Sequence, residues 1–154
     1  MENSGQSVSR TRLRPSPEEA AFLELLRTTD MLSRRLSQVL KAEELSSNQY
    51  NVLRILRGAP EGLPCGEIGN RMITRDPDIT RLLDRLEKRS LIMRWRENKD
   101  RRIVLARITP EGLDLLARLD GPIQETHHRQ LGHLGSESLR VLTVLLQESR
   151  ARIG

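Results

Sequence analysis

The stretch of sequence that decides the fold is DPDITRLLDRLEKRSLIMRWRENKDRRIVLARI, residues 76–108. In its first half, apolar residues recur every three or four positions from Ile79 to Leu86, which predicts an amphipathic helix over residues 77–89. Asp76 is expected to cap this helix, with Pro77 at its first position. The opposite face of the helix carries acidic, hydroxyl and basic side chains, so that face is the candidate for recognition.

The second half of the stretch has the pattern of a β-hairpin. Residues 92–96 alternate as a strand, residues 97–100 are turn-prone, and residues 102–108 are rich in β-branched side chains and predict a return strand. A short helix, a tight connection, a second helix with a polar outer face and a hairpin together define a winged helix-turn-helix.

Helical patterns flank this stretch on both sides. Residues 17–43 predict a long amphipathic helix, and Ser46 with Gln49 has the spacing of a capping box that opens a second helix. Leu63-Pro64 is expected to open a short third helix. After the hairpin, Thr109-Pro110 begins a helix that Pro122 is expected to kink, and Ser136 is expected to cap the last helix.

The expected fold class is therefore mainly α with a small β-hairpin. We expect a flexible basic tail at residues 1–16, a winged helix-turn-helix at about residues 46–109, and dimerisation helices at about residues 17–45 and 110–153. The long front helix lacks enough core of its own to cover its apolar stripe, so we expect a second copy of the chain to cover it.

Basic residues are concentrated in the same stretch. The net charge is +5, but residues 71–107 hold 12 Lys and Arg against 6 Asp and Glu, whereas the other residues hold 14 against 15. A local excess of positive charge suits a polyanion, because each neutralised phosphate releases condensed counterions. A solvated arginine-rich surface explains the charge equally well. The order of the elements decides in favour of double-stranded DNA.

Exposed side chains of the helix and the turn are the candidate contacts to DNA. Arg81 and Arg85 lie four positions apart on one face and can reach guanine edges or phosphates. Asp78 either caps the helix or accepts a hydrogen bond from a cytosine amino group, and both alternatives remain open. Asp100 is expected to brace an arginine of the wing. The candidate DNA-binding set is Arg75, Asp78, Thr80, Arg81, Arg85, Lys99, Arg101 and Arg102.

Three motifs resemble the MarR (multiple antibiotic resistance regulator) family. Residues 77–92 resemble its recognition-helix signature, residues 100–112 resemble its D-x-R wing and the start of its next helix, and residues 47–53 are similar to its second-helix opening. The resemblance covers about residues 18–150. A departure is Ser90, where the family usually has glycine after the helix, because a left-handed conformation costs serine more than glycine.

The resemblance implies a cytoplasmic homodimer whose first, fifth and sixth helices intertwine. It implies a repressor, or less often an activator, on a pseudo-palindromic operator, with Arg102 in the minor groove and Thr80, Arg81 and Arg85 at the major groove. It also implies a small aromatic effector, bound in the cleft between the dimer helices and the winged domain.

Other classes of function are set aside on the sequence. No run reaches the length of a membrane span, and one cysteine, Cys65, fits a reducing compartment. No phosphate loop or nucleophile–base motif indicates an enzyme, and no cofactor is expected. Cys65 is expected to be a buried, inert thiol. Adjacent histidines point to different helix faces, so we expect no metal site at His127, His128 or His133. The alternative is a winged-helix module that contacts other proteins in a larger assembly.

Overall fold

The computed structural model describes residues 14–153, so most of the basic tail expected at residues 1–16 lies outside the described residues. The observed fold is mainly helical with a small sheet, as the sequence predicts. The elements are α1 (Pro17–Lys41), α2 (Ser47–Arg57), β1 (Leu63–Pro64), α3 (Cys65–Arg71), α4 (Ile79–Lys88), β2 (Ile92–Arg96), β3 (Val104–Ile108), α5 (Pro110–Leu131), a 3-10 turn (Gly132–Leu134) and α6 (Gly135–Ala151).

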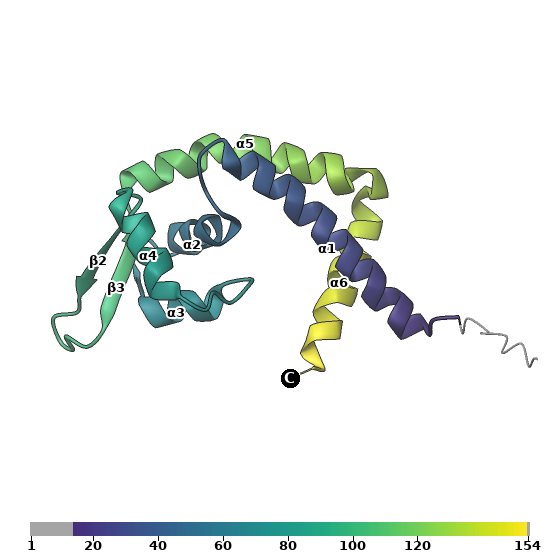
Figure 1. Cartoon of the computed structure of the whole chain (residues 1–154), viewed down its shortest axis with the longest axis horizontal. Coiled ribbons are helices and arrows are strands. Elements are labelled where there is room, and N and C mark those ends of the chain that lie inside the picture. The colour runs from purple at the N-terminus through teal and green to yellow at the C-terminus, as the bar shows by residue number, and fades with distance from the viewer. Residues whose placement is uncertain (1–13, 154) are drawn as a thin grey trace, which may run out of the picture.

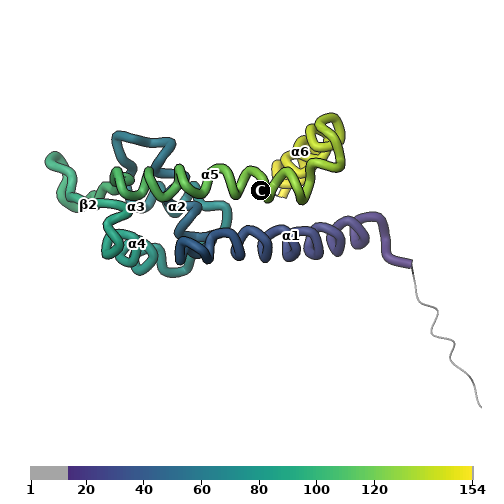
Figure 2. Tube along the Cα trace, turned by 90° about the horizontal axis from the view of Figure 1, so that it is seen from above, coloured from purple at the N-terminus to yellow at the C-terminus, as the bar shows by residue number. Residues whose placement is uncertain are grey.

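The chain has a winged part and an extended helical part. Figure 1 shows α2, α3, α4 and the sheet gathered at one end, beneath the first turns of α5. From the winged part, α1 and α5 extend side by side, as Figure 2 shows from above, and α6 folds back from the far end of α5. None of the described helices is long and apolar enough to cross a membrane.

The core lies where α1, α2, α4, the sheet and α5 meet. Its fully buried side chains include Leu40, Leu53, Leu86 and Leu116, one from each of these four helices. Burying a leucine side chain stabilises the fold by about 2 kcal/mol. On α4, Leu82, Leu83 and Leu86 all point into this core, so the opposite face of the helix is turned to solvent.

Side-chain caps begin the helices that frame the site. The predicted capping box of α2 is confirmed: the Ser46 hydroxyl accepts from the Gln49 amide at 3.1 Å, and the Gln49 side chain accepts from the Ser46 amide at 3.0 Å. Thr109 caps α5 by accepting from the Gly112 amide at 3.1 Å. A side chain at Gly112 would overlap the carbonyl oxygen of Leu91, so glycine lets α5 start directly against the sheet.

The short third helix follows Leu63-Pro64 as the sequence predicts, because α3 begins at Cys65 with Pro64 at its N-cap. The sheet, however, differs from the predicted two-stranded hairpin. Leu63-Pro64 also forms β1, which pairs with β3 through Leu63 opposite Ala106, so the sheet has three strands in the order β1-β3-β2. Proline is tolerated there because β1 lies at the sheet edge. The return strand β3 begins at Val104 rather than at residue 102, since the turn occupies the residues before it.

One expectation about the C-terminal helices needs correction. Pro122 lies inside α5, which continues to Leu131, and the kink expected there stays a prediction. Ser136 does not cap α6: the helix begins one residue earlier, at Gly135, and has no side-chain cap. Gly135 takes a φ of 78°, a conformation that glycine adopts without strain and that lets the chain reverse between α5 and α6.

The connection from α4 to the sheet runs through Ser90 in a left-handed conformation. Its φ is 59°, a conformation that glycine adopts more easily than serine. The Ser90 carbonyl oxygen accepts a hydrogen bond from the Thr109 hydroxyl at 2.6 Å. This backbone conformation strains a residue that has a Cβ.

We expect Ser90→Gly to raise the free energy of unfolding by up to about 1 kcal/mol, because the relief of left-handed strain exceeds the entropy that glycine adds to the unfolded chain. Thermal or urea unfolding measures the change. The matched control is Ser37→Gly, in the right-handed interior of α1, which should lower stability. Equal destabilisation by both substitutions would contradict the assignment of strain to Ser90.

Candidate nucleic-acid interface

The solvent face of α4 carries a row of free polar groups. Thr80, Arg81 and Arg85 are all exposed, because the leucines on the other side of the helix are buried. Neither Arg81 nor Arg85 forms an ion pair with any part of the chain that the structure describes. Their guanidinium groups are therefore available to phosphates and base edges.

The start of α4 is held by two carboxylates in different roles. Asp78, rather than Asp76, is the N-cap: its side chain accepts from the Arg81 amide at 3.1 Å, and α4 begins at Ile79, so Pro77 lies outside the helix. Asp76 accepts from the Asp78 amide and from the Asn48 side chain, each at 2.8 Å. These hydrogen bonds hold the pKa of Asp76 below its ordinary value.

The wing tip is a tight turn built around Asp100. The backbone of the turn closes through the Glu97 amide on Ile103 and the Ile103 amide on Asp100, each at 3.0 Å. The Asp100 carboxylate accepts from the Arg102 amide and Nε at 3.1 Å and from Nη2 at 3.2 Å. Arg102 is thereby oriented, although its side chain remains 92% exposed.

The charge of Asp100 is secured by the same contacts. Hydrogen bonds from Arg102 hold the pKa of the Asp100 carboxyl below its ordinary value. The brace is therefore complete at neutral pH, and it is lost only as the pH falls through this lowered pKa. Lys99 and Arg101 are exposed on the same turn, and Arg75 is exposed on the connection before α4.

Several arginines of the basic stretch are committed to internal contacts that sequence reasoning missed. Arg89 donates to the backbone carbonyls of Glu43 at 3.0 Å and Glu44 at 2.9 Å, which ties the end of α4 to the turn after α1. Arg107 lies over the Trp95 ring at 5.4 Å. Arg94 pairs with two acids of α4. Strand alternation places Arg94 on the face toward α4, and this was the signal that could have identified it.

Cys65 and the histidines lie apart from this surface. Cys65 is half-buried at the start of α3, and burial raises the pKa of its thiol, which disfavours the reactive thiolate. In residues 14–153, no three His, Cys, Asp or Glu side chains come together in a way that could hold a metal ion.

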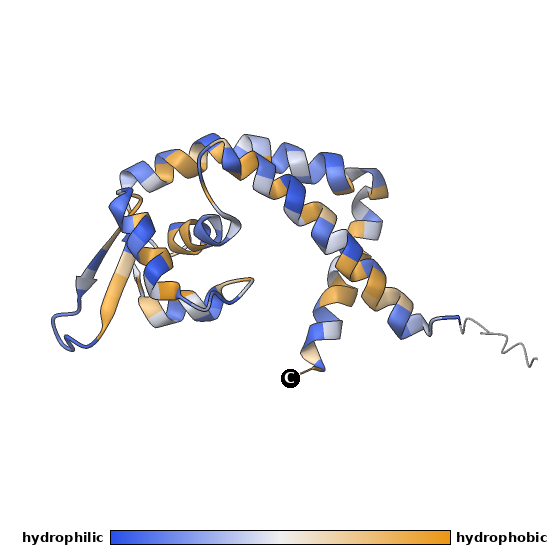
Figure 3. Ribbon diagram, in the orientation of Figure 1, coloured by the Kyte–Doolittle hydropathy of each residue, from blue (hydrophilic) through white to orange (hydrophobic). Residues whose placement is uncertain are grey.

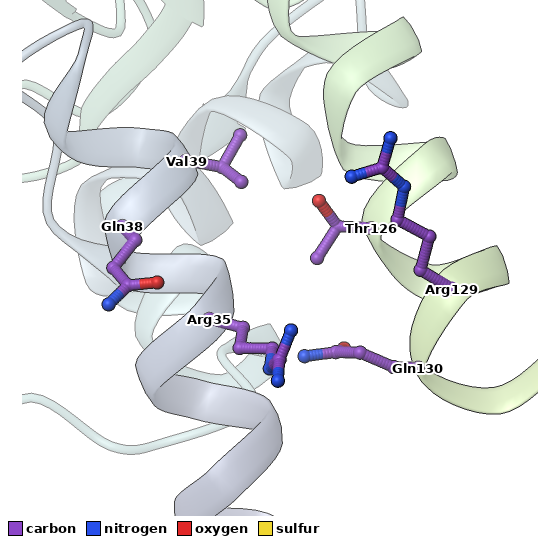
Figure 4. Close-up of a pocket in the computed structure, with 6 residues that line it drawn as sticks. All are labelled: Arg35, Gln38, Val39, Thr126, Arg129 and Gln130. Atoms are coloured by element: carbon purple, nitrogen blue, oxygen red, sulfur yellow. The ribbon is translucent and has the colours of Figure 1, made fainter.

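Two clefts open beside α1. One, of about 250 Å³, lies between α1 and α5 and is polar: Figure 4 shows the Arg35 guanidinium facing the Gln130 amide, with Val39 on the α1 side and Arg129 on α5. The other, also about 250 Å³, lies between α1, α2 and the α3–α4 connection. Its lining includes Ser33, Leu36, Asn48, Tyr50, Asn51, Arg54, Ile73, Thr74 and His127.

Comparison with known proteins finds similarity to the MarR family and to transcriptional regulators. The MarR family model matches residues 45–104. The transcriptional regulator PecS of Dickeya dadantii is 30% identical over 124 residues, 79% of this chain and 75% of PecS. The homoprotocatechuate degradative operon repressor of Escherichia coli is 25% identical over 130 residues, 84% of this chain and 87% of the repressor.

Solved structures agree with these relatives. The MarR transcription factor of Planctomyces limnophilus superimposes with a TM-score of 0.68 and 39% identity, over 88% of this chain and 98% of that one. NadR in complex with 4-hydroxyphenylacetate superimposes with a TM-score of 0.73 and 26% identity, over 92% of this chain and 99% of NadR.

The contact between Asp100 and Arg102 predicts the direction in which DNA affinity changes when the carboxylate is removed. Asp100→Asn removes a negative charge, so simple charge attraction would tighten DNA binding. We instead expect binding to weaken by about twofold to fivefold, because Arg102 loses its orientation. Fluorescence anisotropy with a labelled duplex at fixed salt measures the affinity. The control is Glu97→Gln, which removes the same charge from the wing, should bind equally or more tightly, and breaks no side-chain hydrogen bond to the part of the chain that the structure describes.

Proposed function

The chain belongs to the MarR family, and from that premise we propose that it is a transcriptional regulator that binds double-stranded DNA of defined sequence. We propose that it acts as a ligand-responsive repressor, as a homodimer on a pseudo-palindromic operator. The observation that carries this proposal is that α4 exposes two arginines without an ion pair in residues 14–153 and that the wing exposes an oriented arginine. Figure 1 shows α4 and the β2–β3 hairpin at the same end of the molecule.

The two basic surfaces suit the two grooves of DNA. A major groove about 12 Å wide admits one helix, so α4 can present Thr80, Arg81 and Arg85 to base edges and phosphates. The hairpin tip then reaches the adjacent minor groove, where the negative potential favours an arginine such as Arg102. Lys99, Arg101 and Arg75 are placed to contact flanking phosphates.

A homodimer is supported by apolar surface that the winged part does not cover. Figure 3 shows hydrophobic residues along the outer half of α1 and along α6. They are Phe22, Leu25, Leu26, Met31, Val141, Leu142, Val144 and Leu145, each at least 37% exposed. A second copy would bury these faces, and a two-fold dimer would present two α4 helices to two half-sites. We accordingly retain residues 17–45 and 110–153 as the dimerisation part.

The cleft between α1 and α2 suits a small aromatic acid. Arg54 lies 5.7 Å from the centroid of the Tyr50 ring, so a cation and an aromatic face stand together at this cleft, with His127 on its α5 side. Such a lining can stack an aromatic ring and pair with a carboxylate. The complex of NadR with 4-hydroxyphenylacetate supports this class of ligand. The protein would act in the cytoplasm and catalyse no reaction.

Two asparagines connect this cleft to the recognition helix. The Asn51 side chain accepts from the Ile73 amide at 2.8 Å, and the Asn48 side chain donates to Asp76 at 2.8 Å. Both asparagines line the cleft, and both of their partners belong to the connection that leads into α4. A ligand that competes for Asn51 would therefore loosen the start of the recognition helix and lower the affinity for DNA.

Selection of bound duplexes from a random DNA pool tests the function. We expect a two-fold sequence with half-sites about one helical turn apart. With that duplex, Arg81→Gln/Arg85→Gln should weaken binding at least about a hundredfold and lower the salt-dependence slope by about two. The control Arg150→Gln, at the end of α6, should leave both nearly unchanged. A wild-type slope near zero would instead favour the winged-helix module for protein contact.

The role of the asparagines is tested without knowing the ligand. Asn51→Ala should weaken operator binding by about fivefold, because it removes a hydrogen bond worth about 1 kcal/mol from the connection before α4. Hydrogen exchange of the Ile73 amide should become faster. Ser33→Ala lines the same cleft without contacting the connection, and should change neither measurement. Unchanged operator binding by Asn51→Ala would contradict the proposal that the cleft is coupled to α4 through Asn51.

A further inference from the structure

Arg94, in the middle of β2, is attached to two successive turns of the recognition helix. Its Nη2 atom forms ion pairs with Asp84 and, at 3.0 Å, with Glu87 of α4. Its backbone amide donates to the other oxygen of Glu87 at 2.9 Å. The Arg94 side chain is 19% exposed, much less than the free arginines around it. We propose that Arg94 is a positioning residue that holds the wing at a fixed angle to the recognition helix.

The wing is anchored at its base and again farther along β2. At its base, the Leu91 amide donates to Leu86 at 3.1 Å and the Thr109 amide donates to Leu91 at 3.0 Å. Farther out, β3 is paired on both sides, with β1 and with β2, whereas β2 is an edge strand that lies beside α4. Within residues 14–153, the hydrogen bonds between the sheet and α4 that lie nearest to the wing tip are those that Arg94 donates to Asp84 and Glu87. The turn at residues 97–103 begins three positions later.

Arg94 also neutralises two acidic side chains of α4. Asp84 and Glu87 lie on the same helix as the arginines proposed to meet DNA, and their side chains are 47% and 40% exposed. Within the described residues, Arg94 is the cation with which each of them pairs. These pairs raise the pKa of Arg94, which therefore remains charged. Without Arg94, two carboxylates would stand uncompensated close to the phosphates.

A fixed wing has a specific consequence for recognition. A helix in the major groove and an arginine in the minor groove can engage together only if their separation matches that of the grooves. A wing that swings about its base would keep phosphate contacts one at a time but lose simultaneous docking. Operator affinity should therefore depend on Arg94 more strongly than affinity for random-sequence DNA does. This inference rests on the proposed DNA-binding function.

The test uses three variants and two independent measurements. Arg94→Met keeps an unbranched apolar stem and removes the guanidinium group with its charge, and Arg94→Lys keeps the charge. Asp84→Asn/Glu87→Gln/Arg94→Met removes the ion pairs without leaving unpaired carboxylates. Trp95 is the only tryptophan and follows Arg94 on β2, so its fluorescence anisotropy and acrylamide quenching in the free protein report on the wing. Affinities for the selected operator and for a random-sequence duplex are the second measurement.

We expect Arg94→Met to increase Trp95 mobility and quenching, and to weaken operator binding about tenfold or more while random-duplex binding falls less. Arg94→Lys should restore most of the operator affinity. The triple variant should restore random-duplex affinity, but neither operator affinity nor Trp95 immobility. Arg57→Met, which breaks the distant ion pair with Asp120, controls for loss of an arginine and should alter neither measurement.

Two outcomes overturn the inference. Operator affinity fully restored in the triple variant would make Arg94 a charge neutraliser and not a positioning residue, and unchanged Trp95 mobility in Arg94→Met would show that the wing is held elsewhere. If the wild-type chain binds neither duplex, the proposed function fails, while the Trp95 measurement still decides whether Arg94 holds the wing. If Arg94→Met does not fold, Arg94→Lys and the triple variant decide the same question.

Discussion

Burial of one face of α4 is the constraint on which the rest of the site depends. Leu82, Leu83 and Leu86 are at most 8% exposed in the core formed with α1, α2, the sheet and α5. Because a helix has a period of 3.6 residues, burying these three side chains determines the rotation of α4 about its axis. That rotation alone turns Thr80, Arg81 and Arg85 to solvent, and no additional contact is needed to expose them.

The positive charge of the central stretch serves two purposes. Arg81, Arg85 and Arg102 carry free or merely oriented guanidinium groups at the surface. Arg89 and Arg94 instead use their donors on backbone carbonyls and on carboxylates of α4. Arginine suits both uses, because its planar group offers several donors in fixed directions and stays charged when half-buried. The basic residues of the stretch are therefore not all available to a phosphate.

At the start of α4, the acidic side chains of the proposed DNA-binding surface form hydrogen bonds within the protein. Asp78 caps the helix, and Asp76 receives hydrogen bonds from the Asp78 amide and from Asn48. Their negative charge is thus directed to backbone and side-chain donors rather than to phosphates. Asn48 at the same time borders the cleft beside α1, so the support of the recognition helix and the proposed effector site share a side chain.

By itself the sequence determined the order of the helices and of the hairpin, the capping box at Ser46 and the strained Ser90, because these depend on local periodicity and backbone preference. It also indicated the exposed arginines of α4 and of the wing. The tertiary structure decided which aspartate caps α4, that Leu63-Pro64 adds a third strand, and that Arg89 and Arg94 bind within the protein. The third strand and the contacts of Arg89 and Arg94 join residues 7 to 46 positions apart, and Asp76 is engaged by Asn48, 28 positions away. The rules of local sequence carry no information about such contacts.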